Sequence, residues 1–509
     1  MQVSDKLALP AILALAGVLR LLNLGRSFDG DEILTVVGAR QPLADLPAHL
    51  AQEAHPPLSY LLLHGWLGLG ESEVWARLLF VVTGLVVCAA TYRLARQIGD
   101  QGLARASALL VAIAPGMVWA SQYARSYILG SLFATAAAVL FLRVIRSSGA
   151  MRACAGYAAL SAAAVYTFYP TVLGTVAQGV YAILRFRRRP LLALKILGIQ
   201  TVVALSLLPW LGLATAQFAK ISDTPVLMAG KGFYVLGVHL GGAGRSLIGT
   251  VGLDPLFLGV QPISEQWPRA LLVMGTLVAA AGFSAIVVGG IRSLRQRGAG
   301  AEAWFLALGV LVPVLLANLV HGWARISLAA HYFVIFYPLF AVLAAAAWSS
   351  LRGRVLRGGV AAAAVVLLLV RATVMAYAPD EGWREIAGHV RRGLQAGDMV
   401  ALFPAGSLSW RYYAPEIPQV VTVSEHMVID RVTRSFTFDG RGARAFERAL
   451  SPFSRVWLVT GPFRALGGHE ALRQWFADHG LIEVDRRMIG RSALVLYVRR
   501  GVRASGEPG

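Results

Sequence analysis

The sequence has 509 residues, of which 57% are hydrophobic and 15% are charged. Soluble domains carry roughly 45–50% apolar and about 25% charged residues, so this composition excludes a soluble globular protein and predicts an integral membrane protein. The net charge of +20 does not indicate a nucleic-acid partner. The arginines fall in short loops between apolar runs, which is the pattern that membrane topology produces.

Apolar runs of about 20 residues are long enough to cross a bilayer. The chain contains about eleven such runs, which lie near residues 7–25, 74–94, 103–120, 126–145, 153–169, 170–186, 190–213, 268–290, 302–320, 332–350 and 358–377. The fifth and sixth are divided only by Tyr169-Pro170, where we assume a tight turn. We therefore predict a polytopic α-helical membrane domain over residues 1–377.

The loops between these runs differ sharply in charge. One alternate set is rich in arginine and contains Asp100 as its one acid. The positive-inside rule places this set in the cytoplasm. The other set then faces outward and consists of 26–57, 121–125, 214–267, 321–331 and everything after about residue 378. Because no nucleotide pool exists outside, this placement argues against a nucleotide-sugar or ATP substrate. The richness in arginine, alanine and glycine with few lysines indicates a GC-rich bacterial gene, so we expect a multi-pass protein of the bacterial plasma (inner) membrane.

The chain becomes less hydrophobic after residue 378. Helical patterns alternate there with short β-rich runs, as in EGWREIAGHVRRGL followed by MVALFP. This alternation predicts a small extracytoplasmic α/β domain over residues 378–509 with a largely parallel sheet. The domain has no G-x-G-x-x-G or P-loop motif that would indicate a nucleotide.

Three acids follow the first apolar run: Asp29, Asp31 and Glu32. Carboxylates beside a membrane span are costly to place and usually functional. The residues alone leave two interpretations open. Asp29 or Asp31 caps the helix that begins here, since acids favour helix N-termini, or one acid faces a reaction centre while its neighbour braces it. Adjacent helical residues point about 100° apart, so Asp31 and Glu32 would not share one task.

The predicted outer loops also carry candidates for binding a phosphate. His55, in the sequence His-Pro-Pro, either belongs to a rigid entry into the next helix or orients a carboxylate or phosphate. Arg125 either snorkels to the interface or binds a lipid phosphate bidentately, with Tyr127 nearby. Further outward cations complete a predicted basic pocket opposite the acids: Lys231, Arg245, Arg325 and His331.

Several short blocks follow one another along the chain: Asp31-Glu32 after the first run, H-P-P-L-x-Y-x-L-L-H-x-W at 55–66, S-E-x-x-x-R-L at 72–78, S-Q-x-A-R-x-Y at 121–127, W-R at 383–384 and G-D-x-V at 397–400. In combination they resemble the bacterial family 39 type of membrane glycosyltransferases, related to protein O-mannosyltransferases and to aminoarabinose lipid A transferases. Two positions depart from that family's pattern. Tyr123 stands where an acid is common, and His331-Tyr332 stands where many relatives have an arginine before an aromatic pair.

The resemblance implies a C-type glycosyltransferase fold, a polyprenyl-phosphate sugar as donor, inversion at the anomeric carbon and an outward-facing active site. It implies that Asp31 is the general base for the acceptor hydroxyl, that Glu32 is the second acid and that His55 is the loop histidine. The resemblance does not identify the sugar. It allows three classes of acceptor: a lipid such as lipid A, a glycan or a protein.

The predicted function is therefore transfer of a sugar from a polyprenyl phosphate to a hydroxyl. Asp31 takes the acceptor's proton, and Arg125 with Arg245 or Lys231 stabilises the departing phosphate. The scheme needs no cofactor, and a divalent metal is compatible with it but not required. The alternatives are a lipid-linked-sugar transporter or flippase, which predicts polar residues in the middle of several spans, and an oligosaccharide ligase or polymerase.

Overall fold

The computed structural model describes residues 2–51, 53–223, 269–324, 330–404, 406–429, 436–461 and 469–500. Its contacts divide the chain into two compact units. The first unit comprises Met1–Leu24 and Gly38–Tyr377, and the second comprises Gly25–Val37 and Ala378–Gly509. The part of the predicted outer loop that holds the three acids therefore belongs, by its contacts, to the C-terminal unit.

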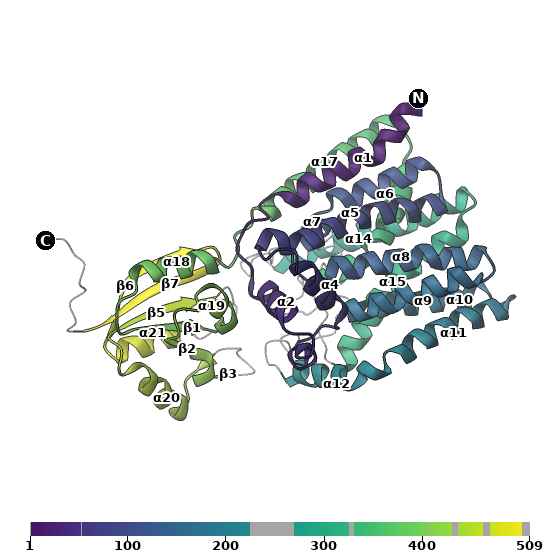
Figure 1. Cartoon of the computed structure of the whole chain (residues 1–509). Coiled ribbons are helices and arrows are strands. Elements are labelled where there is room, and N and C mark those ends of the chain that lie inside the picture. Colours follow the sequence, from purple (N-terminus) through teal and green to yellow (C-terminus); the bar gives the residue numbers. More distant parts are fainter. Residues whose placement is uncertain are drawn as a thin grey trace. The chain divides into compact units, whose positions relative to one another are not determined.

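The first unit is helical, and its long helices pack side by side (Figure 1). In chain order the described helices up to Tyr377 are α1 (Gln2–Leu21), α2 (Gly30–Arg40, which crosses the unit boundary), α3 (Leu46–Leu50), α4 (Leu58–Leu67), α5 (Glu73–Ile98), α6 (Gln101–Ile113), α7 (Pro115–Ser121), α8 (Tyr127–Arg146), α9 (Met151–Thr167), η1 (Tyr169–Thr171), α10 (Val172–Arg185), α11 (Pro190–Ser206), α12 (Leu208–Asp223), α14 (Arg269–Gln296), α15 (Gly300–Ala324), η3 (Ala330–Phe336), α16 (Tyr337–Ser349) and α17 (Arg354–Ala376). Every predicted apolar run coincides with one of these helices or with a closely spaced pair.

Among the described residues, five helices are long and apolar enough to cross a membrane: Glu73–Ile98, Tyr127–Arg146, Gly300–Ala317, His331–Ser349 and Arg354–Val374. Two bent pairs, α6 with α7 and α11 with α12, raise the number to seven if each pair is one span. The prediction of a multi-pass helical protein is confirmed. The predicted count of about eleven also includes helices shorter than the roughly 20 residues of a full span, such as α9 with 17 residues and α10 with 14, and that count stays a prediction.

The bend of 61° between α6 and α7 falls at Pro115, which has no N–H to continue α6. A helix end leaves carbonyls without intrahelical donors. The fully buried guanidinium of Arg20 donates to the carbonyls of Val111 at 3.2 Å and Ala112 at 2.8 Å. It also donates to Ser121 Oγ at 3.0 Å. Arg20 therefore replaces the donors that the bend removes and ties α1 to the S-Q motif.

Two further residues support this junction. The Gln122 amide donates to the carbonyls of Leu19 at 3.1 Å and Leu22 at 2.8 Å, which lie at the C-terminal end of α1. In α5, Gly84 leaves room for the Arg20 side chain, because a Cβ atom there would lie 2.8 Å from Arg20 Nε. Ser121 and Gln122, the first residues of the S-Q motif, thus hold the backbone that leads to Arg125 against the end of α1.

The second unit contains a five-stranded sheet of order β2-β1-β5-β7-β6 and a separate pair, β3 and β4. The strands are β1 (Asp398–Phe403), β2 (Val420–Thr422), β3 (Val428–Ile429), β4 (Phe436–Thr437), β5 (Arg455–Thr460), β6 (Leu481–Ile489) and β7 (Ser492–Arg499). Strand β1 pairs in parallel with β2 and β5. Strand β7 is antiparallel to both β5 and β6.

The sheet is therefore mixed, and the predicted largely parallel arrangement is wrong for its second half. Strands β6 and β7 are separated only by Gly490 and Arg491. Two residues are too few for the crossover that parallel strands require, so the strands form a hairpin. Gly490 has φ of +58°, a conformation that glycine adopts without steric cost.

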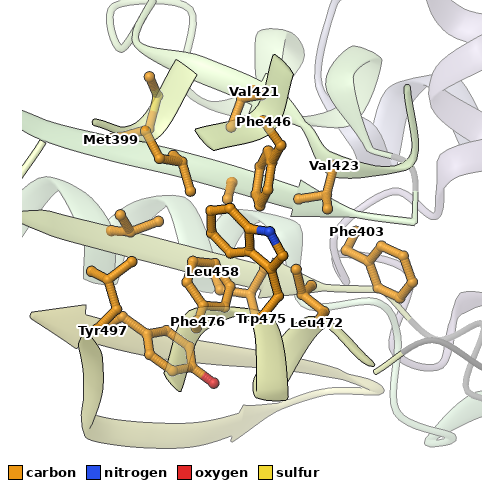
Figure 2. Packing of buried hydrophobic residues seen from close by; sticks show 14 of the residues in the cluster. Met399, Phe403, Val421, Val423, Phe446, Leu458, Leu472, Trp475, Phe476 and Tyr497 are labelled. Atoms are coloured by element: carbon orange, nitrogen blue, oxygen red, sulfur yellow. The ribbon is translucent and has the colours of Figure 1, made fainter. Parts of the chain in front are cut away.

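Helices cover the sheet of the second unit: α18 (Trp383–Gly393), α19 (Ser407–Tyr413), η4 (Val423–His426), α20 (Gly440–Leu450) and α21 (His469–Asp478). One face packs against Phe446 of α20 and Trp475 of α21, whose rings lie 4.6 Å apart between centroids (Figure 2). Because strand side chains alternate between faces, Val400 and Leu402 of β1 point to the other face, and both are fully buried.

We predict that Arg20→Met destabilises the first unit. The substitution removes the donors to two buried carbonyls, and each unsatisfied carbonyl costs about 1–3 kcal/mol. A lower midpoint in thermal unfolding of the detergent-solubilised protein is the expected result. Arg143→Met, at an exposed position near the end of α8, is the control with the same loss of charge. Equal midpoints for the two variants would contradict the role assigned to Arg20.

Candidate active site

The segment that carries the acids is held by side chains of its own unit. Three of its backbone N–H groups donate to residues that follow Ala378: Ser27 to Asp380 Oδ2 at 2.8 Å, Phe28 to Tyr413 Oη at 2.6 Å and Gly30 to Glu381 Oε2 at 3.0 Å. The first amides of a helix have no intrahelical acceptor. These side chains supply acceptors for the start of α2 and for the two residues just before the capping position.

Asp29 occupies the capping position of α2, since its carbonyl accepts from the N–H of Ile33 at 3.0 Å. Its carboxylate accepts hydrogen bonds from residues of the C-terminal segment. Asp29 Oδ1 accepts from the N–H of Glu381 at 3.2 Å, and Asp29 Oδ2 accepts from Arg491 Nη2 at 3.1 Å. The expectation that Asp29 caps the helix therefore holds for its backbone, whereas its side chain joins the loop to the β6–β7 turn.

Glu32 is fully buried and completes the cap. Its Oε2 accepts from the N–H of Asp29 at 3.2 Å, three residues earlier. This is the return hydrogen bond of a capping box. The resemblance implies a second catalytic acid at Glu32, but the geometry gives its carboxylate a part in folding the loop.

Asp31 is exposed, in contrast to the largely buried Asp29 and the fully buried Glu32. It lies in the first turn of α2, where the helix dipole favours a carboxylate. The Thr35 hydroxyl donates to its carbonyl at 3.1 Å. Of the three acids that the sequence singles out, Asp31 is thus the one that the fold presents at the surface of its unit.

Two carboxyl groups at this loop, Asp29 and Glu381, have raised pKa values. Burial is the main cause of a rise in the pKa of Glu381 to about 7, and the nearby Asp29 adds to it. Burial also raises the pKa of Asp29, with Glu32 contributing. Arg491 acts in the opposite direction on both groups. Glu381 therefore takes up a proton at a higher pH than an ordinary glutamate.

The first unit holds a separate group of predicted site residues. His55 is buried, and its Nδ1 lies 3.3 Å from Ser126 Oγ, beside the S-Q motif. Its ring stacks on Phe168 with 5.9 Å between centroids. The carbonyl of His55 accepts from Gln217 Nε2 at 3.1 Å. Burial, together with Arg125 and His331, holds the pKa of His55 well below its usual range, so its imidazole is neutral.

His55 lies at the edge of a group of packed rings that we call the aromatic cluster. Its members are Trp119, Tyr123, Tyr127, Phe168 and Tyr332, with His331 also at its edge. Tyr127 is central, with centroid distances of 5.0 Å to His331 and 6.4 Å to His55. Sequence reasoning missed Trp119, although its spacing of four from Tyr123 matches neighbours on a helix. Tyr123, which departs from the family pattern, stacks on Trp119 at 4.9 Å.

Arg125 is buried and does not snorkel. Its Nη1 lies 3.8 Å from Glu53 Oε2, and both side chains are more than nine-tenths buried. The structure thus brings together His55, Arg125, Tyr127 and His331, four of the predicted binding residues. Lys231, Arg245 and Arg325 lie outside the described residues. Within the described ranges, no group of three or more His, Cys, Asp or Glu side chains is arranged to hold a metal.

The comparisons with known proteins agree with this architecture. Residues 54–212 match the family model of dolichyl-phosphate-mannose-protein mannosyltransferases. No curated protein matches the chain. Among solved structures, ArnT from Cupriavidus metallidurans bound to undecaprenyl phosphate is similar, with a TM-score of 0.52 and 15% identity over 98% of this chain and 99% of that chain.

A second similar structure is the oligosaccharyltransferase AglB from Archaeoglobus fulgidus, in complex with an inhibitory peptide and a dolichol-phosphate. Its TM-score is 0.51, with 11% identity over 94% of this chain and 73% of that chain. ArnT in the apo state matches with a TM-score of 0.52 and 14% identity over 96% of this chain and 97% of that chain. The predicted C-type fold and the predicted family resemblance are confirmed.

We predict a pH dependence of stability that originates at Glu381. Its pKa in the folded protein, about 7, lies above the ordinary value of 4.5, so the folded state binds a proton that the unfolded state releases. The free energy of unfolding should therefore fall as the pH rises from about 4.5 to about 7. Above that range the ionisation of Glu381 should not lower it further. In Glu381→Gln this fall should be shallower.

The measurement is the thermal unfolding midpoint of detergent-solubilised protein between about pH 5 and about pH 8. Glu447→Gln, an exposed position on α20 of the same unit, is the matched control and should keep the wild-type slope. Parallel curves for wild type and Glu381→Gln would rule out Glu381 as the titrating group.

Proposed function

We propose that this membrane glycosyltransferase of the C-type fold moves a sugar from a polyprenyl-phosphate donor to a hydroxyl acceptor, with inversion at the anomeric carbon. The observation that carries the proposal is the division of work among three acids. Asp29 and Glu32 are engaged in fixing the loop, and Asp31 is exposed at the start of a fixed helix. A carboxylate presented in this way suits a general base.

The donor class is supported by similarity. ArnT was solved with undecaprenyl phosphate and AglB with a dolichol-phosphate, and residues 54–212 match a family named for dolichyl-phosphate-mannose. That range includes His55 and Arg125. The proposed acceptor is a lipid such as lipid A, a glycan or a protein, and the AglB structure holds an inhibitory peptide. Mass spectrometry of envelope lipids and glycans from a deletion strain would identify the acceptor.

In the proposed reaction the acceptor hydroxyl attacks the anomeric carbon from the side opposite the phosphate. Asp31 accepts the hydroxyl proton while the new carbon–oxygen bond forms. The bond between the anomeric carbon and the phosphate oxygen breaks, and the polyprenyl phosphate leaves with the electron pair. The leaving group needs no proton because cations offset its charge.

Arg125 is the proposed partner of that phosphate among the described residues. Buried guanidinium groups bind phosphate through parallel hydrogen bonds, and water exclusion strengthens the attraction. Neutral His55 and the hydroxyl of Tyr127 provide polar contacts without adding charge. Lys231, Arg245 and His331 remain proposed contributors to the same binding function.

The reaction is proposed to take place on the outer face of the plasma membrane, with the C-terminal unit extracytoplasmic. The arginine-rich loops, assigned to the cytoplasm by the positive-inside rule, support this orientation. A transporter has less support, because the buried charge of Arg20 is engaged by the carbonyls of a bent helix.

We predict that Asp31→Asn lowers kcat for transfer from a polyprenyl-phosphate sugar by about 10²–10⁴-fold, the usual contribution of a general base. The amide keeps the size of the side chain but cannot accept the proton. The control is Asp45→Asn, an exposed acid at the start of α3 with no side-chain cap hydrogen bond. Near-wild-type turnover in Asp31→Asn would remove Asp31 from the mechanism.

We predict that Arg125→Gln raises KM for the polyprenyl-phosphate donor and lowers kcat, because the phosphate is bound in the ground state and gains charge in the transition state. Removing one such electrostatic contact typically costs about 10²–10³-fold in kcat. Arg40→Gln, at an exposed position at the end of α2, is the control for loss of an outward cation. Unchanged donor kinetics in Arg125→Gln would place phosphate binding elsewhere.

A further inference from the structure

The β6–β7 hairpin ends directly on the segment that precedes α18. The N–H of Arg491 donates to the carbonyl of Asp380 at 2.7 Å. Two glycines allow this approach. A Cβ on Gly490 would overlap the carbonyl oxygen of Asp380, and a Cβ on Gly382, whose φ is +75°, would lie 2.7 Å from the carbonyl oxygen of Ile489.

This packing brings the Arg491 side chain to the acidic loop. Its Nη2 lies 3.1 Å from Asp29 Oδ2 and 3.9 Å from Glu381 Oε1. The other oxygen of Glu381 is already used, since Oε2 accepts from Trp383 Nε1 at 2.6 Å and from the N–H of Gly30. One guanidinium therefore faces two largely buried carboxylates, one of which holds the first amide of α2.

Asp380 holds Ser27, two residues before Asp29, in the same manner. Its Oδ2 accepts from both the N–H and the hydroxyl of Ser27, at 2.8 and 2.7 Å, and its Oδ1 accepts from the N–H of Gly382 at 3.0 Å. Arg384 donates to the carbonyl of Gly25 at 3.1 Å. The residues from 380 to 384 thus engage the loop on both sides of Phe28.

We propose that Arg491, through Asp29 and Glu381, is a positioning residue that sets the orientation of the first turn of α2 and hence of the Asp31 carboxylate. This inference rests on the proposed function of Asp31. It assigns the C-terminal unit a part in the reaction, although none of Asp29, Glu381 and Arg491 touches the reacting atoms. Without Arg491, the two neighbouring carboxylates lose the guanidinium that faces both of them, and their repulsion loosens the contact at Gly30.

The experiment compares Arg491→Gln and Arg491→Lys with wild type in the full-length, detergent-solubilised protein. Arg491→Gln is expected to lower kcat by up to about 10²-fold, the effect of a small displacement of a catalytic group, with little change in KM for the donor. Arg491→Lys is expected to recover part of kcat, because it keeps the charge near Asp29 but loses the planar fork.

Hydrogen exchange of residues 25–37 supplies the structural measurement. It should accelerate in Arg491→Gln and stay at the wild-type rate in Arg473→Gln. Arg473 is the matched control, since it forms an exposed ion pair with Glu470 on α21 of the same unit. Arg473→Gln should also keep wild-type kcat and KM.

The outcomes separate this inference from the proposed function. If Asp31→Asn is inactive while Arg491→Gln keeps wild-type kcat, the positioning role is overturned and the base remains. If Asp31→Asn is active, the proposed function falls and the positioning role falls with it. If Arg491→Gln lowers the unfolding midpoint as well as kcat, and Arg491→Lys restores the midpoint but not the full kcat, positioning is supported over a purely structural role.

Discussion

The constraint on which this structure depends is that backbone groups at interrupted helices need partners away from water. Side chains supply them at each interruption near the candidate site. Arg20 donates to the carbonyls freed where α6 bends into α7, and Gln217 donates to the carbonyls of Leu50 and His55. Asp380 and Glu381 accept from amides at and before the start of α2. Several buried polar side chains in this protein thus stabilise the backbone.

This division explains why three neighbouring acids have different roles. A carboxylate that is buried and hydrogen bonded to backbone amides is held in one place and is less able to take part in proton transfer. Asp29 and Glu32 are in that position. Asp31, by contrast, is exposed in the first turn of α2. The catalytic proposal for Asp31 therefore depends on the contacts of Asp29, Asp380 and Glu381 that hold this turn.

The aromatic cluster in the first unit likewise sets the surroundings of polar side chains. Its rings pack against His55 and His331, and burial together with Arg125 and His331 holds the pKa of His55 well below its usual range. A cation such as Arg125 acts more strongly in such surroundings than at an exposed position. Tyr123 contributes a stacked ring where relatives often carry an acid, so one negative charge fewer lies near the proposed phosphate partner.

The sequence by itself determined the class of the protein, the places of its helices, the family resemblance and the residues worth testing, because apolar periodicity and short ordered motifs are local properties of the chain. It also indicated a C-terminal α/β unit, but it missed that β6 and β7 form a hairpin. Only the tertiary structure decided which acid is exposed, that Arg491 meets Asp29 from 462 residues away in sequence, and that Arg20 is buried. These are long-range contacts, and neither hydrophobic pattern nor residue spacing encodes which distant side chain will satisfy a given backbone group.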